Sequence, residues 1–587
     1  MFCGAHVRPL IAVVLIPYLI ANPTILAGQQ ASTDTATMTI RANTRLVMVD
    51  VVVTDKKGQP VPGLKADDFT IEENGKKQKV AVFVAPGSAQ AAPTPAPPGI
   101  LSNRPENVGP AGVPTVLLLD AANSPFKDQS YARSQMLKYA AEQVQDGRPI
   151  AVFSLTDRVH VLQQFTSDPQ VLADAIKKLR PQEQTLRSAG PAPESHGVST
   201  GLGRQGGEGA SNALIGSAQL AAQQFADVQV GYNLEARTVL TIEAMKSLSR
   251  ILGGLPGRKN VVWLTASLPF DLIPEDRNVT DAELQADLPG QGKQRSVTVN
   301  AAGSAASESR QLYAREIRAA EAELASASIA IYPVDVTGLT SGMETSAASG
   351  GSVYTDTAVT DRVLAGLSAQ QSSQGTMKEV AAQTGGKAYV NQNEIKEGIV
   401  LALSDEKASY SLGYYPENKK WDGKLRNIKV KLSQGDAQLR YRKGYFAMEP
   451  GPAKDHNFEQ DVAAALMVDA PSTQISFRAQ AKPTDPGKIK VVFLVDARTL
   501  TAEDSGGNKK MNVAFYAGVF DSNGKNLGTQ SMKVDRAFDS ATYQQILDHG
   551  MMLPMDIPVP SGGSQLRLAV LDNKTGLIGT VSGPLGQ

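Results

Sequence analysis

Cysteine is almost absent from this chain of 587 residues. The one cysteine, Cys3, comes before the apolar run of a predicted signal peptide, whereas the cysteine of a lipoprotein follows that run. If the signal peptide is removed on export, the mature chain has no thiol. This would exclude disulfides, cysteine nucleophiles and cysteine-ligated metals from the mature protein.

Histidine is also scarce, and neither sign of charge dominates. The chain has 58 basic and 58 acidic residues, and 5% of its residues are aromatic, so the composition favours neither nucleic acid nor an anionic membrane as a partner. After the signal peptide only His160, His196, His456 and His549 remain, and no two of them have metal-ligand spacing. No H-E-x-x-H motif or phosphate loop occurs. The sequence therefore predicts that the protein is not an enzyme.

The first 28 residues have the pattern of a secretory signal peptide. Arg8 precedes a mostly apolar run, Leu10 to Ile20, and small residues follow at Ala27 and Gly28. The alternative is an uncleaved amino-terminal anchor. In both cases we expect the rest of the chain to be exported, to the periplasm, the cell envelope or the medium, with no membrane span left after cleavage.

The chain is organised around an apolar run, Val113 to Leu119, that ends at Asp120. A run of this length without alternation is typical of a central strand that is covered on both faces, and an amphipathic segment, Tyr131 to Val144, follows it. A strand that leads into a helix through a short loop favours a parallel α/β sheet. Asp120 would then lie at the carboxyl end of the strand, where such sheets bind ligands.

Strands and helices alternate through residues 113–404, which predicts a doubly wound α/β domain with a mostly parallel sheet. A tight turn at residues 156–158 makes one strand antiparallel. Polar insertions interrupt the pattern at 180–230 and 269–306. The six predicted strands are Thr115–Asp120, Pro149–Leu155, Val159–Phe165, Asn260–Thr265, Ile329–Val334 and Lys387–Val390.

All-β domains are predicted on both sides of this α/β domain. Residues 39–86 contain short alternating runs and an Asn74-Gly75 turn, which suits a small β-sandwich. A linker rich in proline and alanine follows at 87–112. Residues 405–450 read as a β-meander, and 458–587 as a carboxyl-terminal β-sandwich. Chain order predicts that 39–86 and 405–450 pack together as one β-unit.

Several motifs in the chain resemble those of exported von Willebrand factor A (VWA)-related proteins of the acidobacterial type. The matching segments are Leu117–Phe126, Leu252–Asn260, Ile331–Asp335, Leu412–Pro416 and Arg442–Phe446. The resemblance covers about residues 39–447. It implies a VWA, Rossmann-like fold and a metal-ion-dependent adhesion site, in which Mg²⁺ or Mn²⁺ leaves one coordination position for a partner's carboxylate.

The adhesion site that this resemblance implies is incomplete in this chain. Asp120, Ser124 and a threonine, Thr241 or Thr238, match expected ligands. Ala122 and Ala266 stand where a serine and an aspartate are expected. Carboxylates of neighbouring loops, at Asp128, Asp271 or Glu275, could supply further oxygens. Without them, Asp120 would accept hydrogen bonds from its own loop or cap the next helix.

These observations favour a non-catalytic, exported protein for adhesion or scaffolding at the cell envelope. Its unknown protein ligand would contact a face formed by Asp120, Asn123, Ser124, Thr265 and Ser267. The alternatives are a cell-envelope hydrolase or carbohydrate-processing accessory, with a groove formed by the two insertions, and a purely structural envelope protein.

Overall fold

The structure is a computed structural model. It describes residues 46–87, 93–110, 112–143, 148–181, 233–269, 313, 316–338, 357–392, 394–433, 437–448 and 457–585. The predicted signal peptide and nearly all of the two predicted insertions lie outside these residues, as do Asp271 and Glu275. No helix within the described ranges is both long and apolar enough to cross a membrane.

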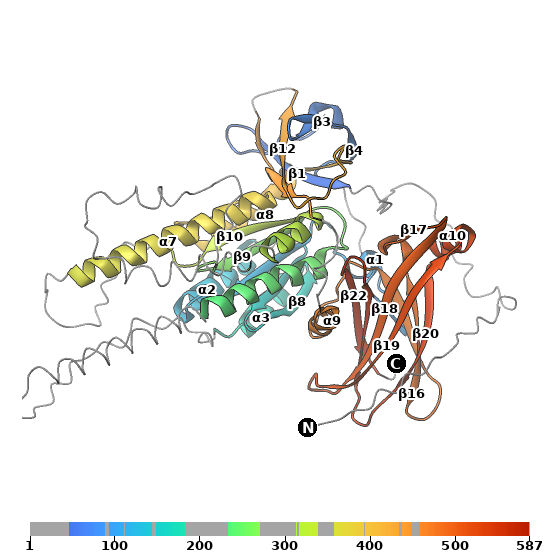
Figure 1. The fold of residues 1–587 in the computed structure, drawn as a ribbon. Helices are drawn as coiled ribbons and strands as arrows, with labels where there is room; N and C mark the ends of the chain where they lie inside the picture. The colour runs from blue at the N-terminus through green and yellow to red at the C-terminus, as the bar shows by residue number, and fades with distance from the viewer. Residues whose placement is uncertain are drawn as a thin grey trace, which may run out of the picture. The chain divides into compact units, whose positions relative to one another are not determined.

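A five-stranded mixed sheet forms the centre of the α/β domain (Figure 1). Its strand order is β10-β9-β6-β7-β8, and only β8 is antiparallel to its neighbour. The strands are β6 (Thr115–Asp120), β7 (Ile150–Leu155), β8 (Val159–Thr166), β9 (Lys259–Thr265) and β10 (Ile329–Asp335). Every residue of β6, β7, β9 and β10 is buried, as expected for strands covered on both faces.

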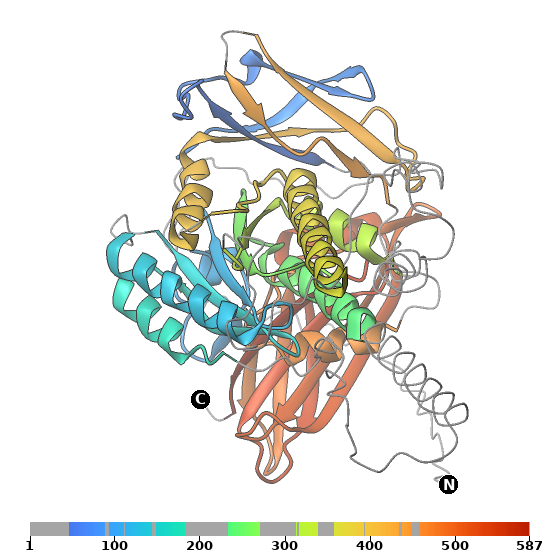
Figure 2. The ribbon, with the colours of Figure 1, turned by 90° about the vertical axis from the view of Figure 1, so that its left-hand side faces the viewer.

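Helices cover both faces of this sheet, as Figure 2 shows. On one face the apolar core contains residues of α2 (Phe126–Gln143), α3 (Pro169–Lys178) and α8 (Ile395–Ser404). On the other face it contains residues of helices at 233–252 and 316–326 and of α7 (Thr357–Thr384). The predicted α/β fold with a mostly parallel sheet is confirmed at this level.

Two details of the α/β prediction are wrong. The predicted sixth strand, Lys387–Val390, makes only a single bridge, between Tyr389 and Val334, because the chain turns at once into α8. The sequence pattern indicates a helix only over Met377–Thr384, before Gly385-Gly386, whereas α7 already begins at Thr357. Gly366, Gly375 and the serines between them have low helix propensity, and they hid the part of the helix that precedes Met377.

The segments on either side of the α/β domain form one β-unit of two four-stranded sheets, as chain order predicts. One sheet has the order β13-β1-β11-β4 and the other β14-β12-β2-β3, and both contribute to one apolar core. The strands of the first segment are β1 (Val47–Thr54), β2 (Phe69–Glu73), β3 (Lys76–Gln78) and β4 (Val80–Val84). Those of the second are β11 (Ser409–Tyr414), β12 (Leu425–Leu432), β13 (Gln438–Arg440) and β14 (Gly444–Phe446).

This pairing corrects the predicted folds of the two segments. Residues 39–86 are not a sandwich by themselves, because β1 pairs with β11 and β13, and β2 pairs with β12. Residues 405–450 are not a meander either, since β11 and β12 belong to different sheets. Among the described strands, only β2 with β3 and β12 with β14 pair within a segment, so each sheet is completed by strands of the other segment.

The carboxyl-terminal sandwich also takes a strand from outside its predicted range. Its sheets have the orders β20-β16-β15-β5 and β17-β18-β21-β22, with β19 paired to β18. The strands are β5 (Ile100–Ser102), β15 (Phe477–Pro483), β16 (Lys488–Val495), β17 (Glu503–Ser505), β18 (Asn508–Phe520), β19 (Asn526–Phe538), β20 (Met551–Pro558), β21 (Gln565–Asp572) and β22 (Ile578–Pro584). The remaining helices are α1 (Pro105–Val108), α9 (Phe458–Leu466) and α10 (Ser540–His549), and short 3₁₀ turns lie at Ala66–Asp68, Asp405–Ala408 and Ala497–Thr499.

The prediction that residues 87–112 are only a linker is therefore wrong. β5 and α1 lie within that range, and β5 pairs with β15. The proline-rich composition around this three-residue strand hid it, because a strand this short leaves no readable alternation.

Candidate functional site

Asp120 is the last residue of β6, and its carboxylate is fully buried. Its Oδ1 accepts a hydrogen bond from the backbone N–H of Asn123 at 2.9 Å. Its Oδ2 lies within hydrogen-bond distance of three donors: Asn123 Nδ2 at 2.9 Å, Trp263 Nε1 at 2.9 Å and Thr265 Oγ1 at 3.0 Å. The carboxylate is thus surrounded by donors from its own loop and from the neighbouring strand β9.

Asn123 is the central residue of this cluster. Its side-chain N–H groups donate to Asp120 and, at 3.1 Å, to Thr241 Oγ1. Its side-chain oxygen accepts from Arg237 Nε at 2.8 Å. All the polar groups of a buried amide need partners, and Asn123 finds them on β6 and on the helix at 233–252.

Ser124 and the two candidate threonines have partners within the fold. The Oγ of Ser124 accepts from the backbone N–H of Ala266 at 2.9 Å, which ties the loop after β6 to the loop after β9. Thr241 Oγ1 donates to the carbonyl oxygen of Arg237 at 2.8 Å, one helical turn earlier. Thr238 donates in the same way to the carbonyl of Leu234 and does not join the cluster.

Arg237, which is not among the residues predicted from the sequence, lies close to the centre of the site. Besides Asn123, its guanidinium donates from Nη2 to Ser267 Oγ at 2.9 Å. Ser267 in turn donates to the carbonyl of Asn123 at 3.3 Å. Arg237 lies one helical turn before Thr241, and this spacing was the only sequence signal that could have identified it.

Burial shifts the pKa values of Asp120 and Arg237 in opposite directions. Burial raises the pKa of the Asp120 carboxyl above its usual range, and the hydrogen bonds from Asn123, Trp263 and Thr265 only partly offset this. Burial also lowers the pKa of the Arg237 guanidinium, and the Asp120 carboxylate opposes that shift. Asp120 and Arg237 are therefore a charge pair bridged by the Asn123 side chain.

These residues do not fit a magnesium or manganese ion. Mg²⁺ needs several oxygen ligands in near-octahedral geometry. The oxygens of the three predicted metal ligands, Asp120, Ser124 and Thr241, already take part in hydrogen bonds within the protein. The Arg237 cation is next to the cluster and would repel a metal ion. In the part of the chain that the structure describes, no three His, Cys, Asp or Glu residues are grouped to hold a metal.

Asp128, one of the neighbouring carboxylates considered as a further ligand, lies in the first turn of α2 and is buried. It has interaction partners within the protein. The other two, Asp271 and Glu275, lie outside the described residues.

The predicted partner-binding face needs correction, because most of it is buried. Asp120, Asn123, Ser124 and Thr265 are at most 1% exposed, and only Ser267 is partly accessible. These side chains form hydrogen bonds that join the two loops, so they are not available to a partner. The exposed apolar side chains nearby in the chain are Phe126, at 53%, and Val239, at 46%.

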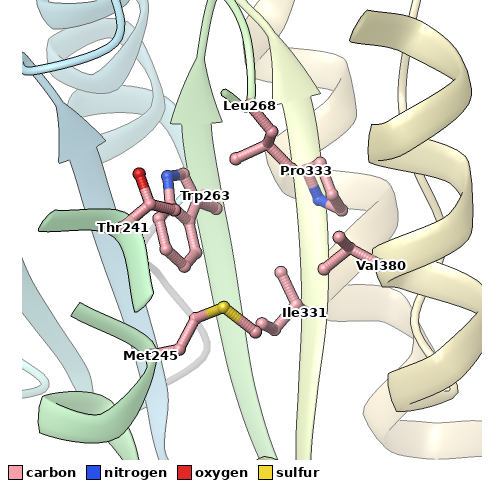
Figure 3. A pocket seen from close by; sticks show the side chains of 7 residues that line it. All are labelled: Thr241, Met245, Trp263, Leu268, Ile331, Pro333 and Val380. Atoms are coloured by element: carbon pink, nitrogen blue, oxygen red, sulfur yellow. The ribbon is translucent and has the colours of Figure 1, made fainter. Parts of the chain in front are cut away.

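A small pocket lies below the cluster on the face of the sheet covered by α7 (Figure 3). Its lining is mostly apolar and consists of Thr241, Met245, Trp263, Leu268, Ile331, Pro333 and Val380. The volume is about 10 Å³, room for about one water molecule. Ligand sites usually have volumes of about 300–1,000 Å³, so this pocket is too small for a substrate.

No protein-family model and no curated protein matches the sequence. Among solved structures, the chain is similar to an aerotolerance-related membrane protein from Bacteroides fragilis NCTC 9343 with multiple mutations to serines, with 13% identity over 50% of this chain and 100% of that chain and a TM-score of 0.21. It is similar to a von Willebrand factor type A protein from Catenulispora acidiphila, with 9% identity over 91% of this chain and 74% of the other and a TM-score of 0.20.

A third similar structure is an endonuclease/exonuclease/phosphatase from Beutenbergia cavernae DSM 12333. The identity is 11%, over 31% of this chain and 38% of that one, and the TM-score is 0.12. At these TM-scores the three likenesses carry no argument about function.

Proposed function

We propose that this chain is a non-catalytic, exported binding protein of the VWA type, with a degenerate adhesion site that works without a metal. Its α/β domain contacts a protein partner at the carboxyl edge of the sheet, around the loops that follow β6 and β9. The β-domains hold this edge away from the envelope surface. The sequence motifs that resemble exported VWA-related proteins support this proposal.

The observation that carries the proposal is the hydrogen-bond cluster that joins the two loops. Ser124 and Ala266 link them directly, and Arg237 links Asn123 to Ser267. A surface that is ordered before binding loses less entropy on association. Phe126, next in the chain to this cluster, exposes half of an aromatic side chain, and aromatic residues are frequent hot spots of protein interfaces.

The same cluster is poorly suited to catalysis. A general acid or base must reach a proton of the substrate, and Asp120 is fully buried and surrounded by donors. His160 pairs with Asp157 Oδ1 at 2.7 Å, near the turn between β7 and β8, and contacts neither a serine nor the Asp120 cluster in the hydrogen bonds of the described residues. The groove proposed between the two insertions lies outside the described residues.

The test is capture from an envelope extract with the immobilised full chain. We expect a protein that binds saturably, and at least ten-fold more weakly to Phe126→Ser. Met552→Ser is the matched control, because Met552 is an apolar side chain, 67% exposed, on β20 of the carboxyl-terminal sandwich. We expect the control to bind the partner like the wild type.

Other outcomes would contradict the proposal. If Phe126→Ser and Met552→Ser bind the partner equally well, the carboxyl edge of the sheet is not the interface. If the chain turns over a glycan or a peptide of the same extract, the protein is an enzyme. The absence of both a saturable partner and turnover would favour a purely structural role.

A further inference from the structure

Arg237 is held in one orientation by two hydrogen bonds. Its Nε donates to Asn123 Oδ1 at 2.8 Å and its Nη2 to Ser267 Oγ at 2.9 Å. Asn123 is in turn fixed by Asp120 and Thr241. The planar guanidinium therefore has its direction set before any partner arrives, which reduces the entropy lost on binding.

The guanidinium still has unused binding capacity. It carries five N–H donors, and the two hydrogen bonds above use two of them. Among the described residues, no carboxylate oxygen lies within 4.0 Å of it, whereas Arg250 pairs with Glu243 and Asp461. Arg237 is half-buried, and its Nη1, which makes no hydrogen bond to the described residues, is not among the fully buried atoms that lack a partner, so Nη1 is accessible to solvent.

The surroundings of Arg237 favour a singly charged, planar anion. The free edge of an arginine guanidinium matches the geometry of a carboxylate, which it can bind through two parallel hydrogen bonds. A phosphate dianion is usually held by several cations, and among the described residues the charge that acts on Arg237 is that of the Asp120 carboxylate rather than that of a second cation. Phe126, an exposed aromatic side chain, lies two residues along the chain from Ser124, which belongs to the same cluster.

We propose that Arg237 is the receptor for a carboxylate of the protein partner, either an Asp or Glu side chain or a carboxyl terminus, and that Phe126 contacts apolar groups of the partner. This inference rests on the proposed function. In this site a fixed guanidinium binds the carboxylate directly, without a metal ion.

The test measures binding of the full chain to amidated hexapeptides with a central Asp or Glu between apolar residues. Matched peptides carry Asn, Gln or phosphoserine at that position, and others have a free carboxyl terminus but no acidic side chain. We expect the wild type to bind carboxylate peptides at least ten-fold more tightly than their amide counterparts. The free-terminus peptides show which source of carboxylate is preferred.

Variants assign this preference to Arg237. We expect Arg237→Gln to abolish the ten-fold preference and Arg237→Lys to keep part of it, because lysine retains the charge without the planar fork. Arg498→Gln removes the same charge at an exposed position of the carboxyl-terminal sandwich and should bind like the wild type. Melting curves establish that each variant is folded.

If Arg237→Gln does not fold, photo-crosslinking of an acidic peptide to the wild type decides. Cross-links at residues 122–126 or 237–239 support the inference, and cross-links elsewhere overturn it. Equal binding of acid and amide peptides, an unchanged preference in Arg237→Gln, or a preference for phosphoserine would also overturn it.

The two proposals can fail separately. A saturable envelope partner that needs Phe126 but binds Arg237→Gln normally would refute the carboxylate site and leave the proposed function standing. If acidic peptides bind through Arg237 but the chain captures no envelope protein, the carboxylate site stands and the proposed function is refuted.

Discussion

Asp120 lies at the carboxyl end of a buried strand, and its carboxylate accepts hydrogen bonds from residues that are far apart in the chain. Asn123 is three residues away in the chain, but Trp263 is 143 residues away and is brought to Asp120 only by the pairing of β6 with β9. Arg237 could not be predicted from the sequence for the same reason, since its link to Asn123 spans 114 residues.

Asp120→Asn should destabilise the protein by about 2–4 kcal/mol, because one of the donors around the carboxylate would then face an amide N–H and remain unsatisfied. Thermal or denaturant unfolding measures this loss. Asp174→Asn is the control, since Asp174 is exposed on α3 and pairs only with surface groups. We expect it to change stability by less than about 0.5 kcal/mol. Equal effects of the two substitutions would show that the Asp120 cluster adds nothing to stability.

At the scale of elements, long regular sequence patterns predicted their helices and strands correctly. They did not predict the three-residue strand β5 or the division of neighbouring strands between two sheets. An aspartate followed by a proline, as at Asp168 and Pro169, is typical of a helix start, and the Asp168 side chain accepts a hydrogen bond from the backbone N–H of Gln170 at 2.8 Å at the start of α3. The division of β11 and β12 between two sheets left no local trace, because both strands look like neighbours in a meander. Their pairing is decided by strands from the other end of the chain.

β5 shows how a short strand is anchored by a side chain rather than by its length. Asn103, just after β5, is fully buried, and its Nδ2 donates to the carbonyls of Ser472 at 2.7 Å and Ile475 at 2.8 Å. Its Oδ1 accepts from the backbone N–H of Phe477 at 2.8 Å. These bonds tie the predicted linker to the edge of β15.

Asn103→Ala should therefore cost about 2–4 kcal/mol, because it leaves two buried carbonyls and one N–H without their partner. The measurement is denaturant unfolding followed by a probe in the sandwich. Asn508→Ala, at an exposed position of β18, is the matched control and should have little effect. If Asn103→Ala unfolds like the control, β5 is not anchored as described.

At the scale of the whole molecule, charged groups connect helix 233–252 with α9. Arg250 pairs with Glu243 at 2.6 Å and with Asp461 of α9 at 3.1 Å. The backbone N–H of Thr473, which follows α9, donates to the carbonyl of Arg250 at 2.7 Å. The hydroxyl of Thr473 donates to the carbonyl of Ile251 at 2.7 Å, so a distant segment supplies donors to the last turn of the helix.

Glu323, on the helix at 316–326, makes this junction sensitive to pH. Burial raises its pKa to about 7, which the cations Arg250 and Lys246 oppose and the carboxylates Glu243 and Asp461 reinforce. A carboxyl whose pKa is higher in the folded than in the unfolded state stabilises the fold when it is protonated. This contribution is complete below the unfolded value of 4.5 and is lost as the pH rises through about 7.

Glu323→Gln should remove that dependence. Relative to the wild type, the variant should gain about 1–2 kcal/mol between pH 5 and pH 8, a figure reduced because Glu323 is partly exposed. Melting curves at the two pH values measure the change. Glu316→Gln, at an exposed position of the same helix, is the control, and an identical pH response of the two variants would contradict the assignment to Glu323.

The most direct test of a metal-free site is a crystal of the full chain soaked in manganese, with anomalous scattering measured around Asp120. We expect no manganese peak there, and we expect Arg237 Nε to lie within hydrogen-bond distance of Asn123 Oδ1. A manganese peak about 2.0–2.2 Å from an Asp120 carboxylate oxygen, with Arg237 displaced, would contradict it.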